Sequence, residues 1–478
     1  MRGSPIASSL LAVALMLSAC DFKWIGGEKK GSSVELEQIH WSRATARQLR
    51  GAIDRRSKHG LDRLQFEGDK ARGDDEALTE AALAYANALA RGASDPAKLY
   101  KIYTLPRPQP DLRRGLAEAV KARKVDQWLE SLAPQDSGYR TLSRTYLTLR
   151  EKGRTASAAL PATGEPLKPD GTDPRVPAIA RQLVSFNYLD EASAQGDRYT
   201  PAMAAAVQRM QIDYGIKPDG IIGGDTLTLL NLTDADRARA IAVDMERMRW
   251  LERRPPPTRI DVNIAAATLT YWRGGQIADV RKVVVGKPDS ATPQLGSAVF
   301  RLVANPTWTV PRSIEREEIA GKGEGYMRRN NMVWKDGRIV QESGPDNSLG
   351  LVKFDMENPY AIYLHDTPVK PLFAEVQRQR SHGCVRVEDA LGFAEVLARD
   401  TGVLDQWHRA QAAGKEAFVP LAREIPVRLL YQTVAFGPDG EPMLREDPYG
   451  WNDPIAAKLG FPASTSRPVQ VSPRDLGP

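Results

Sequence analysis

One part of the sequence combines residue types that support nucleophilic chemistry. Residues 381–386 read Ser-His-Gly-Cys-Val-Arg, and residues 363–367, upstream of them, read Tyr-Leu-His-Asp-Thr. A cysteine nucleophile needs a partly exposed sulfur whose pKa is lowered by nearby positive charge. It also needs a base that takes its proton and donors that face the oxyanion formed at the attacked carbonyl. The two segments contain all of these groups, so the pattern predicts an acyl-transfer nucleophile at Cys384.

The two histidines differ in rank. His365 ends a predicted strand, where a loop can present its imidazole, and we expect it to act as general base and acid. Asp366 or a neighbouring carbonyl would fix its tautomer. His382 is the secondary candidate, because its side chain either orients an acceptor or shapes the turn.

Backbone N–H groups and arginines complete the predicted site. Gly383 permits close backbone approach, and its N–H, with that of Cys384, would form the oxyanion hole. Arg380 and Arg386 would add positive potential around the sulfur.

Two other interpretations of the cysteine are weaker. It could be a buried structural residue, as a lone cysteine in an apolar strand usually is. Two histidines and a cysteine could also bind zinc or copper, but nothing else in the sequence resembles a ligand set. We therefore expect neither a metal nor a cofactor.

The remaining composition narrows the function classes. The chain has 478 residues, 66 basic and 60 acidic side chains, and two cysteines, Cys20 and Cys384. Two cysteines cannot build a disulfide scaffold or a multi-cysteine zinc protein. The excess of +6 is too small to imply a nucleic-acid partner, although it suits an acidic polymer or an anionic membrane face.

The first twenty residues indicate export. An arginine and a short apolar run precede Leu-Ser-Ala-Cys at residues 17–20, which resembles the lipobox of bacterial lipoproteins. That resemblance implies acylation of Cys20 and a lipid anchor in the periplasm. Asp21 would retain it at the inner membrane if the host follows the enteric-type rule. An ordinary secretory signal is the alternative. Either interpretation exports the chain, and in both Cys384 would lack an intramolecular disulfide partner and be a free thiol.

The elements that must position this chemistry change type along the chain. Residues 21–33 fit a tether, and residues 34–160 show helical periodicity typical of a scaffold domain without a catalytic signature. A compact helical unit follows at residues 175–232, and one more helix spans residues 233–254 until three prolines end it. Strands are then predicted at residues 259–264, 267–272, 280–285, 298–303, 360–364 and 425–431. The tail, residues 448–478, is expected to lack a core of its own.

The helical unit carries a second resemblance. Its Asp219-Gly220-x-x-Gly223-x-x-Thr226 pattern is similar to the three-helix peptidoglycan-binding domain found beside many wall enzymes. Each motif residue also has a purely structural role in a turn or core. The pattern therefore specifies a fold better than it specifies a carbohydrate site.

The cysteine segment resembles the catalytic signature of the L,D-transpeptidases, the YkuD-like enzymes of bacterial walls. The resemblance covers residues 258–432 and includes the segment Asn-Pro-x-Trp-x-Val-Pro that begins at Asn305. The chain is similar to the large periplasmic type of this family, which has a scaffold domain, a peptidoglycan-binding domain and a lid. In this sequence the lid is expected at residues 311–355. The implied fold is a multi-domain α+β protein with a mostly-β catalytic domain.

The resemblance implies a mechanism and a substrate. Cys384 would attack the third residue of a tetrapeptide donor stem, release D-alanine and form a thioester. The amine of a second stem would resolve it as a 3→3 cross-link. Carbapenems, which resemble the donor, would acylate the same cysteine. The expected partners are peptidoglycan stem peptides and glycan.

Candidate substrate contacts follow from the same resemblance. They are Tyr363, Asn305, Trp308 and Ser381. Arg386 would either pair with a substrate carboxylate or form a structural ion pair.

Three alternatives stay open. An amide hydrolase or carboxypeptidase would use the same acyl-enzyme and resolve it with water. A related transferase would attach a protein to peptidoglycan. A non-catalytic peptidoglycan-binding lipoprotein belongs to a different class, and an intact His365 and Cys384 pair argues against it.

Overall fold

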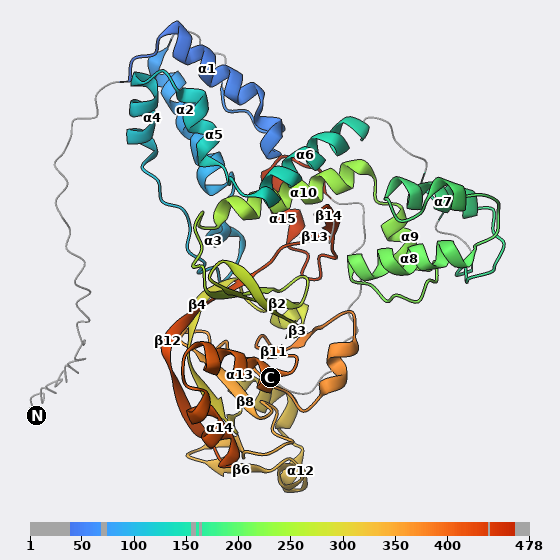
Figure 1. The fold of residues 1–478 in the computed structure, drawn as a ribbon, viewed down its shortest axis with the longest axis vertical. Coiled ribbons are helices and arrows are strands. Elements are labelled where there is room, and N and C mark those ends of the chain that lie inside the picture. The colour runs from blue at the N-terminus through green and yellow to red at the C-terminus, as the bar shows by residue number, and fades with distance from the viewer. Residues whose placement is uncertain (1–38, 68–73, 154–158, 162–164, 438–439, 464–478) are drawn as a thin grey trace, which may run out of the picture.

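The computed structural model describes residues 39–67, 74–153, 159–161, 165–437 and 440–463 (Figure 1). The predicted signal, Cys20 and the tether lie outside these ranges. Across the residues that are described, no helix is both long enough and apolar enough to cross a membrane.

The N-terminal part is a bundle of helices. Most of them begin after a serine or aspartate whose side chain accepts a hydrogen bond from the first turn, as Ser42, Asp74 and Asp136 do. The helices are α1 (Arg43–Asp54), α2 (Asp75–Arg91), α3 (Pro96–Leu99), α4 (Leu112–Lys121), α5 (Val125–Leu132) and α6 (Ser137–Lys152), with a 3₁₀ turn at Arg56–His59.

A helix from later in the chain completes this bundle. α10 (Asp234–Trp250) begins with a capping box between Thr233 and Asp236 and packs against α6 and α2. Its fully buried Arg249 pairs with Glu246 at 2.6 Å and donates to the hydroxyl of Tyr139 at 2.8 Å. Such a pair is tolerated in a core because its hydrogen-bonding groups find partners there. The scaffold is therefore discontinuous in sequence.

The C-terminal residues also join the scaffold. α15 (Asn452–Lys458) packs on α10, and the side chains of Ile455, Ala456 and Leu459 are fully buried in the same core. The described part of the predicted tail thus packs into the core of the scaffold. An apolar triplet spaced for one helix face was the signal for it.

The peptidoglycan-binding-like unit contains α7 (Val176–Ser185), a 3₁₀ turn (Glu191–Ser193), α8 (Pro201–Tyr214) and α9 (Gly224–Leu230). Its motif residues are structural. The Gln211 amide donates to Thr226 at 2.9 Å and accepts from the Gly220 N–H at 2.9 Å, and Asp219 accepts from Ile221 at 2.9 Å. The unit lies to one side of α10 (Figure 1).

The catalytic region is built on one curled sheet. Its strand order is β10-β3-β11-β9-β8-β4-β12-β1-β2, and β2 also pairs with β3, which closes the sheet on itself. Helices α13 (Ala390–Asp400) and α14 (Leu404–Ala412) contribute Phe393, Leu397 and Trp407 to its core. The strands are β1 (Arg259–Asn263), β2 (Thr268–Arg273), β3 (Gln276–Gly286), β4 (Leu295–Ala304), β8 (Val352–Met356), β9 (Leu364–His365), β10 (Gln379–Ser381), β11 (Val385–Val387) and β12 (Ala417–Leu430).

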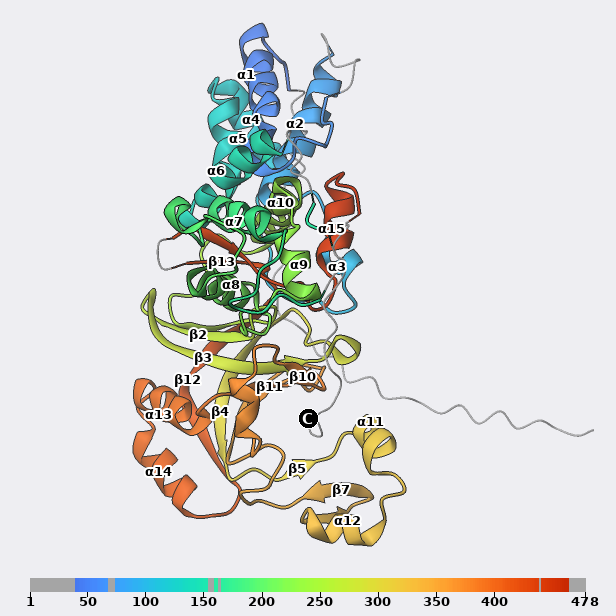
Figure 2. The same ribbon diagram turned by 90° about the vertical axis from the view of Figure 1, so that its right-hand side faces the viewer.

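A smaller sheet lies in the segment predicted to be a lid. Strands β5 (Trp308–Thr309), β6 (Met332–Lys335) and β7 (Arg338–Gln341) pair in the order β5-β7-β6, with α11 (Arg312–Ile314), a π-helix (Glu315–Ile319) and α12 (Gly323–Arg329) packed on them. Figure 2 shows the lid and the scaffold at opposite ends of the catalytic sheet. The lid begins earlier than residue 311, at Trp308, and residues 352–355 belong to β8 instead.

The predicted multi-domain α+β class with a mostly-β catalytic region is confirmed. One predicted strand differs, because residues 360–363 precede a β9 of only two residues. There Ala361 has φ +54°, which interrupts extended backbone. A short hairpin, β13 (Val434–Phe436) and β14 (Pro442–Leu444), links β12 to α15.

Candidate active site

Two neighbouring parallel strands position the candidate nucleophile and base. β9 pairs with β11, and the register places His365 opposite Arg386. Tyr363 and Cys384 come directly before these two strands. The Tyr363 ring lies 5.6 Å from that of His365, and its phenol is hydrogen-bonded to the thiol. The fold therefore brings the base, the phenol and the thiol close together.

The tautomer of His365 follows from one contact. Its Nδ1 lies 2.5 Å from the backbone carbonyl oxygen of Asp366. A carbonyl only accepts, so Nδ1 carries the proton and Nε2 of the neutral ring has its lone pair available. Within the described ranges Nε2 is buried without a hydrogen-bond partner. Of the two ways foreseen to orient the ring, the carbonyl does so, while the Asp366 carboxylate accepts from Leu351 at 3.0 Å.

Burial sets the protonation states of both groups. It lowers the pKa of His365 to about 3, and the charges of Arg386 and Lys353 act in the same direction. Burial also raises the pKa of the Cys384 thiol, against the opposing effects of Tyr363, Lys353 and Arg386. At neutral pH the resting pair is therefore a thiol and a neutral imidazole. The expectation of a lowered thiol pKa is wrong for this state, because the residue is only 9% exposed.

The thiol is surrounded by residues of the β9 approach and the lid. Its Sγ donates to the carbonyl of Ala361 at 3.7 Å, and it is hydrogen-bonded to the Tyr363 phenol. The ring of Tyr363 packs against the lid core that contains Trp308 and meets the ring of His365 edge-on at 5.6 Å. Of the predicted substrate contacts, Tyr363 thus contacts the thiol, and Trp308 lies in the lid core behind Tyr363.

Two buried hydroxyls hold the turn that carries the cysteine. Ser381 Oγ donates to the Cys384 carbonyl at 2.6 Å and accepts from the Gly383 N–H at 3.1 Å. Thr292 Oγ1 donates to the Gly383 carbonyl at 2.8 Å and accepts from the Gly286 N–H at 2.8 Å. Gly383 has φ +121°, a conformation that favours glycine.

These contacts bear on two predicted roles. Ser381 is fully buried and its hydroxyl is used inside the turn, so it shapes the loop instead of facing a substrate. The Gly383 N–H is committed to that hydroxyl and would have to leave it to face an oxyanion. Its part in an oxyanion hole stays a prediction.

Asn305 and Arg386 have positions that the sequence left open. The Asn305 amide donates to the carbonyls of Gln411 at 3.0 Å and Ala410 at 3.3 Å, so it binds the end of α14 instead of facing the thiol. Arg386 is 1% exposed. Its charge acts on both His365 and Cys384, which favours the structural and electrostatic interpretation over a substrate carboxylate.

His382 connects the turn to the lid. Its Nε2 lies 2.6 Å from Glu318 in the π-helix and 3.4 Å from Nζ of Lys287. The π-helix, which the sequence did not predict, places Glu318 beside His382. The contact joins the turn to the lid, and whether His382 orients an acceptor or shapes the turn stays a prediction.

A cavity of about 580 Å³ opens beside the same turn. His382 and Gly383 line it from the turn, and Tyr360 and Ile362 line it on either side of the carbonyl that the thiol contacts. Its opposite wall comes from residues 99–102 of the scaffold. A parallel bridge between Tyr103 and Gln294 holds that segment against the catalytic region.

Sequence reasoning missed Glu318 and the scaffold wall. It included the Thr292-Pro293 pair in the family resemblance but assigned it no role, because the role of the Thr292 hydroxyl depends on Gly383, far along the chain. No local pattern marks the scaffold wall, since its role depends on docking between distant segments.

Comparison with known proteins agrees with this geometry. Residues 257–404 match the model of the "L,D-transpeptidase catalytic domain", a segment that contains the turn, both histidines and the lid. The chain carries an L,D-transpeptidase domain. Residues 37–145 match the "Scaffold domain", and residues 172–230 match the "Putative peptidoglycan binding domain".

Individual relatives of the L,D-transpeptidase domain are distant. A protein of Haemophilus influenzae named "Putative L,D-transpeptidase" is 30% identical over 220 residues, which are 41% of this chain and 45% of that protein. The match therefore spans less than half of the relative's length. An L,D-transpeptidase structure from Stackebrandtia nassauensis is 13% identical over 57% of this chain and 97% of its own, with a TM-score of 0.25. One from Xylanimonas cellulosilytica is 17% identical over 56% and 100%, with a TM-score of 0.21.

Proposed function

We propose that this protein is a peptidoglycan L,D-transpeptidase that forms 3→3 cross-links through a thioester on Cys384. The observation that carries the proposal is Nε2 of His365, which has no hydrogen-bond partner among the described residues and is held in the accepting tautomer. Tyr363 contacts both this imidazole and the thiol. A neutral thiol needs such a base at the moment of attack. A structural cysteine would not.

The acylation step uses this pair. As Sγ attacks the carbonyl of the third stem residue, the Cys384 proton passes to Nε2 of His365. Arg386, Lys353 and the Tyr363 phenol stabilise the negative charge on sulfur, since each acts to lower the thiol pKa. The C–N bond then breaks, D-alanine leaves with the proton returned from His365, and a thioester remains.

The second step needs another substrate. The amine of an acceptor stem attacks the thioester, His365 takes a proton from it, and the sulfur leaves and is reprotonated. We propose that the cavity beside His382 and Gly383 admits one of the two stems, because both residues of the cysteine turn line it. Residues 99–102 would then make the scaffold part of a substrate site.

Location belongs to the same proposal. The Leu-Ser-Ala-Cys segment supports acylation of Cys20 and anchoring in the periplasm, with Asp21 favouring the inner membrane in an enteric-type host. Mass spectrometry of the protein from a membrane fraction tests this, with a diacylglyceryl adduct on Cys20 expected. An unmodified, cleaved N-terminus would overturn it.

The test of activity is direct. The purified chain is incubated with a disaccharide-tetrapeptide, and products are identified by mass spectrometry beside Cys384→Ala and His365→Ala. A cross-linked dimer that requires both residues supports the proposal. A tripeptide alone indicates the carboxypeptidase or hydrolase, and no product with either substrate or carbapenem refutes a cysteine enzyme. The expected carbapenem adduct appears as one added mass on the intact protein and is absent from Cys384→Ala.

A further inference from the structure

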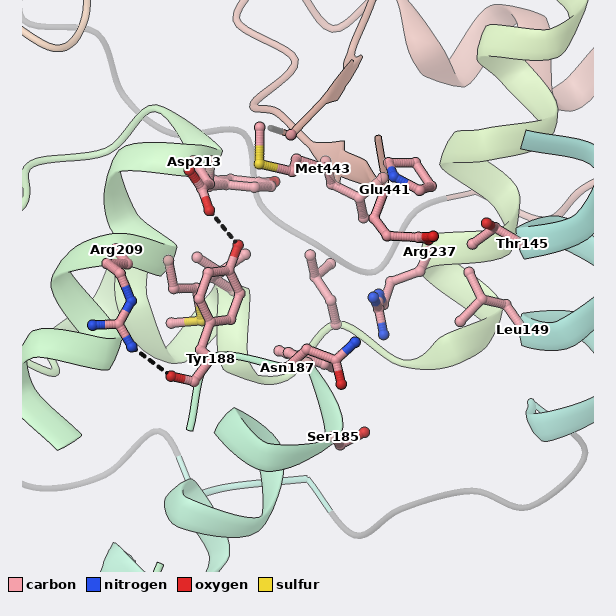
Figure 3. Close-up of a pocket in the computed structure, with 18 of the residues that line it drawn as sticks. Thr145, Leu149, Ser185, Asn187, Tyr188, Arg209, Asp213, Arg237, Glu441 and Met443 are labelled. Carbon is pink, nitrogen blue, oxygen red and sulfur yellow. Dashed lines mark hydrogen bonds between the residues drawn. The ribbon is translucent and has the colours of Figure 1, made fainter. Parts of the chain in front are cut away.

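A second cavity, of about 650 Å³, lies far from the thiol, where three parts of the chain meet. One wall is the peptidoglycan-binding-like unit, a second is helix α6 of the scaffold, and the third is the β13–β14 hairpin (Figure 3). Protein interiors rarely leave voids larger than a water molecule. This space is open and has the size of known ligand pockets.

The first wall presents an ordered polar surface beside aromatic rings. The Tyr188 hydroxyl donates to Asp213 at 2.9 Å, and Arg209 donates to the Tyr188 carbonyl at 2.7 Å, as the dashed lines of Figure 3 show. Phe186 is stacked by the Arg237 guanidinium at 4.6 Å from its ring centre. Both rings are partly exposed, and Tyr188 offers an apolar ring with a polar group at its edge.

The other walls add small polar groups and apolar surface. Thr145 and Thr148 come from α6, and Pro442 and Met443 come from the hairpin. Ser185 and Asn187 close the side opposite the hairpin in Figure 3. Hydroxyl and amide groups around aromatic and methyl surface suit a ligand that has apolar ring faces, many hydroxyls and acetamido groups.

Charge favours a sugar over a polyanion. The lining contains basic side chains at Lys152, Arg209 and Arg237 and acidic ones at Asp213 and Glu441. The numbers of acidic and basic side chains in the lining are close to equal. Asp213 is already bonded to Tyr188, and Arg237 is already paired with Asp234. A strongly anionic polymer would need an excess of free positive charge.

We infer that this cleft binds the N-acetylated disaccharide repeat of the peptidoglycan glycan, and that the scaffold and hairpin supply part of the site. The inference rests on the proposed function, since the same polymer carries the stems that Cys384 would acylate. It differs from a site within the helical unit alone, whose motif residues are used internally as described above.

The hairpin also sets where a bound glycan would lie. Just after β14, Glu446 donates its N–H to the Tyr214 carbonyl at 2.9 Å and thereby joins the hairpin to α8. Three residues later, Tyr449 accepts from the Thr292 N–H at 3.3 Å and donates to the Gly286 carbonyl, beside the catalytic turn. One short segment therefore touches both the cleft and the turn. A glycan held in the cleft would lie at a set position relative to Cys384.

The experiment measures glycan binding separately from catalysis. The probe is a peptide-free tetrasaccharide of alternating N-acetylglucosamine and N-acetylmuramic acid, titrated into the chain by calorimetry. Thr148→Trp fills the cleft from α6, and Ser185→Trp fills it from the helical unit. Arg144→Trp, on an exposed part of α6 outside the lining, is the matched control. Thermal unfolding verifies that each variant is folded.

We expect both filling variants to weaken binding at least about tenfold, or 1.4 kcal/mol, and the control to stay within about twofold of the parent. Loss in Ser185→Trp alone would show that the helical unit binds without the scaffold, and unchanged binding in both would exclude the cleft. Absence of binding by the parent would also overturn the inference. Carbapenem acylation of Cys384 is measured in every variant. Its failure in the parent would count against the proposed function, whereas its retention with lost glycan binding concerns the cleft alone.

Discussion

Replacing Thr292 with valine removes one hydroxyl and almost nothing else. That hydroxyl donates to the Gly383 carbonyl and accepts from the Gly286 N–H, each at 2.8 Å, and the residue is fully buried. Valine has nearly the same shape but no hydrogen-bonding group. The variant therefore leaves a buried carbonyl and a buried N–H without these partners, directly beside the cysteine.

The magnitude follows from those two groups. A buried polar group that loses its partner costs about 1–3 kcal/mol, so the two together should lower the free energy of unfolding by about 2–4 kcal/mol after some relaxation. Thr292→Ser is the control, because it keeps the hydroxyl and removes only a methyl group, at a cost of about 1 kcal/mol. The difference between the two variants isolates the hydroxyl.

Two assays test this reasoning. Urea unfolding gives the stability of each variant, and intact-protein mass spectrometry gives the rate of carbapenem acylation at Cys384. We expect Thr292→Val to be the less stable variant and to acylate at least about tenfold more slowly, as a turn displaced by a fraction of an ångström loses near-attack geometry. If valine and serine gave equal stability and equal acylation, the hydroxyl would not hold the turn, and the argument would fail.

Three further variants test other parts of the site. Burial raises the pKa of Glu446 from its ordinary 4.5 to about 7. Between these two pH values the folded state holds a proton that the unfolded state has lost. The free energy of unfolding should therefore fall by up to about 3 kcal/mol as the pH rises from about 4.5 through 7. Glu446→Gln should flatten this dependence in urea unfolding from pH 5 to 8, and an unchanged slope would contradict the assignment. Tyr363→Phe removes a hydrogen bond that lowers the thiol pKa. The pH midpoint of the alkylation of Cys384 by iodoacetamide should therefore rise. A midpoint that falls or stays unchanged would argue against that contact. Glu318→Gln weakens the link between the lid and His382. Protease cleavage within the lid should then become several-fold faster. A cleavage rate equal to the parent's would show that this contact does not hold the lid.

Much of the architecture could be predicted because it depends on local patterns. The helical scaffold, the capping box at Thr233 and the strands of the catalytic sheet follow from side-chain period and from capping chemistry. The discontinuity of the scaffold could not be predicted in this way. α10 and α15 have apolar faces, but an apolar face does not determine which element it packs against.

The candidate site could likewise be predicted only in part from local sequence patterns. The residue types and order around Cys384 were enough to predict a thiol nucleophile, a base and a glycine turn. The pairing of β9 with β11 brought the two segments side by side, and this pairing joins segments that are distant in sequence. Asn305 and Ser381 show where prediction from the sequence fails. Both belong to segments that carry the family resemblance, yet both side chains hydrogen-bond to backbone carbonyls.

By itself, the sequence determined which chemistry is available: one thiol near two histidines, on a chain of helical and mostly-β parts. Only the tertiary structure decided the state in which that chemistry rests. Burial makes the thiol and imidazole neutral, the Asp366 carbonyl selects the tautomer, and Thr292 holds the turn. Each of these effects depends on solvent exclusion and on contacts between segments, which no local pattern encodes.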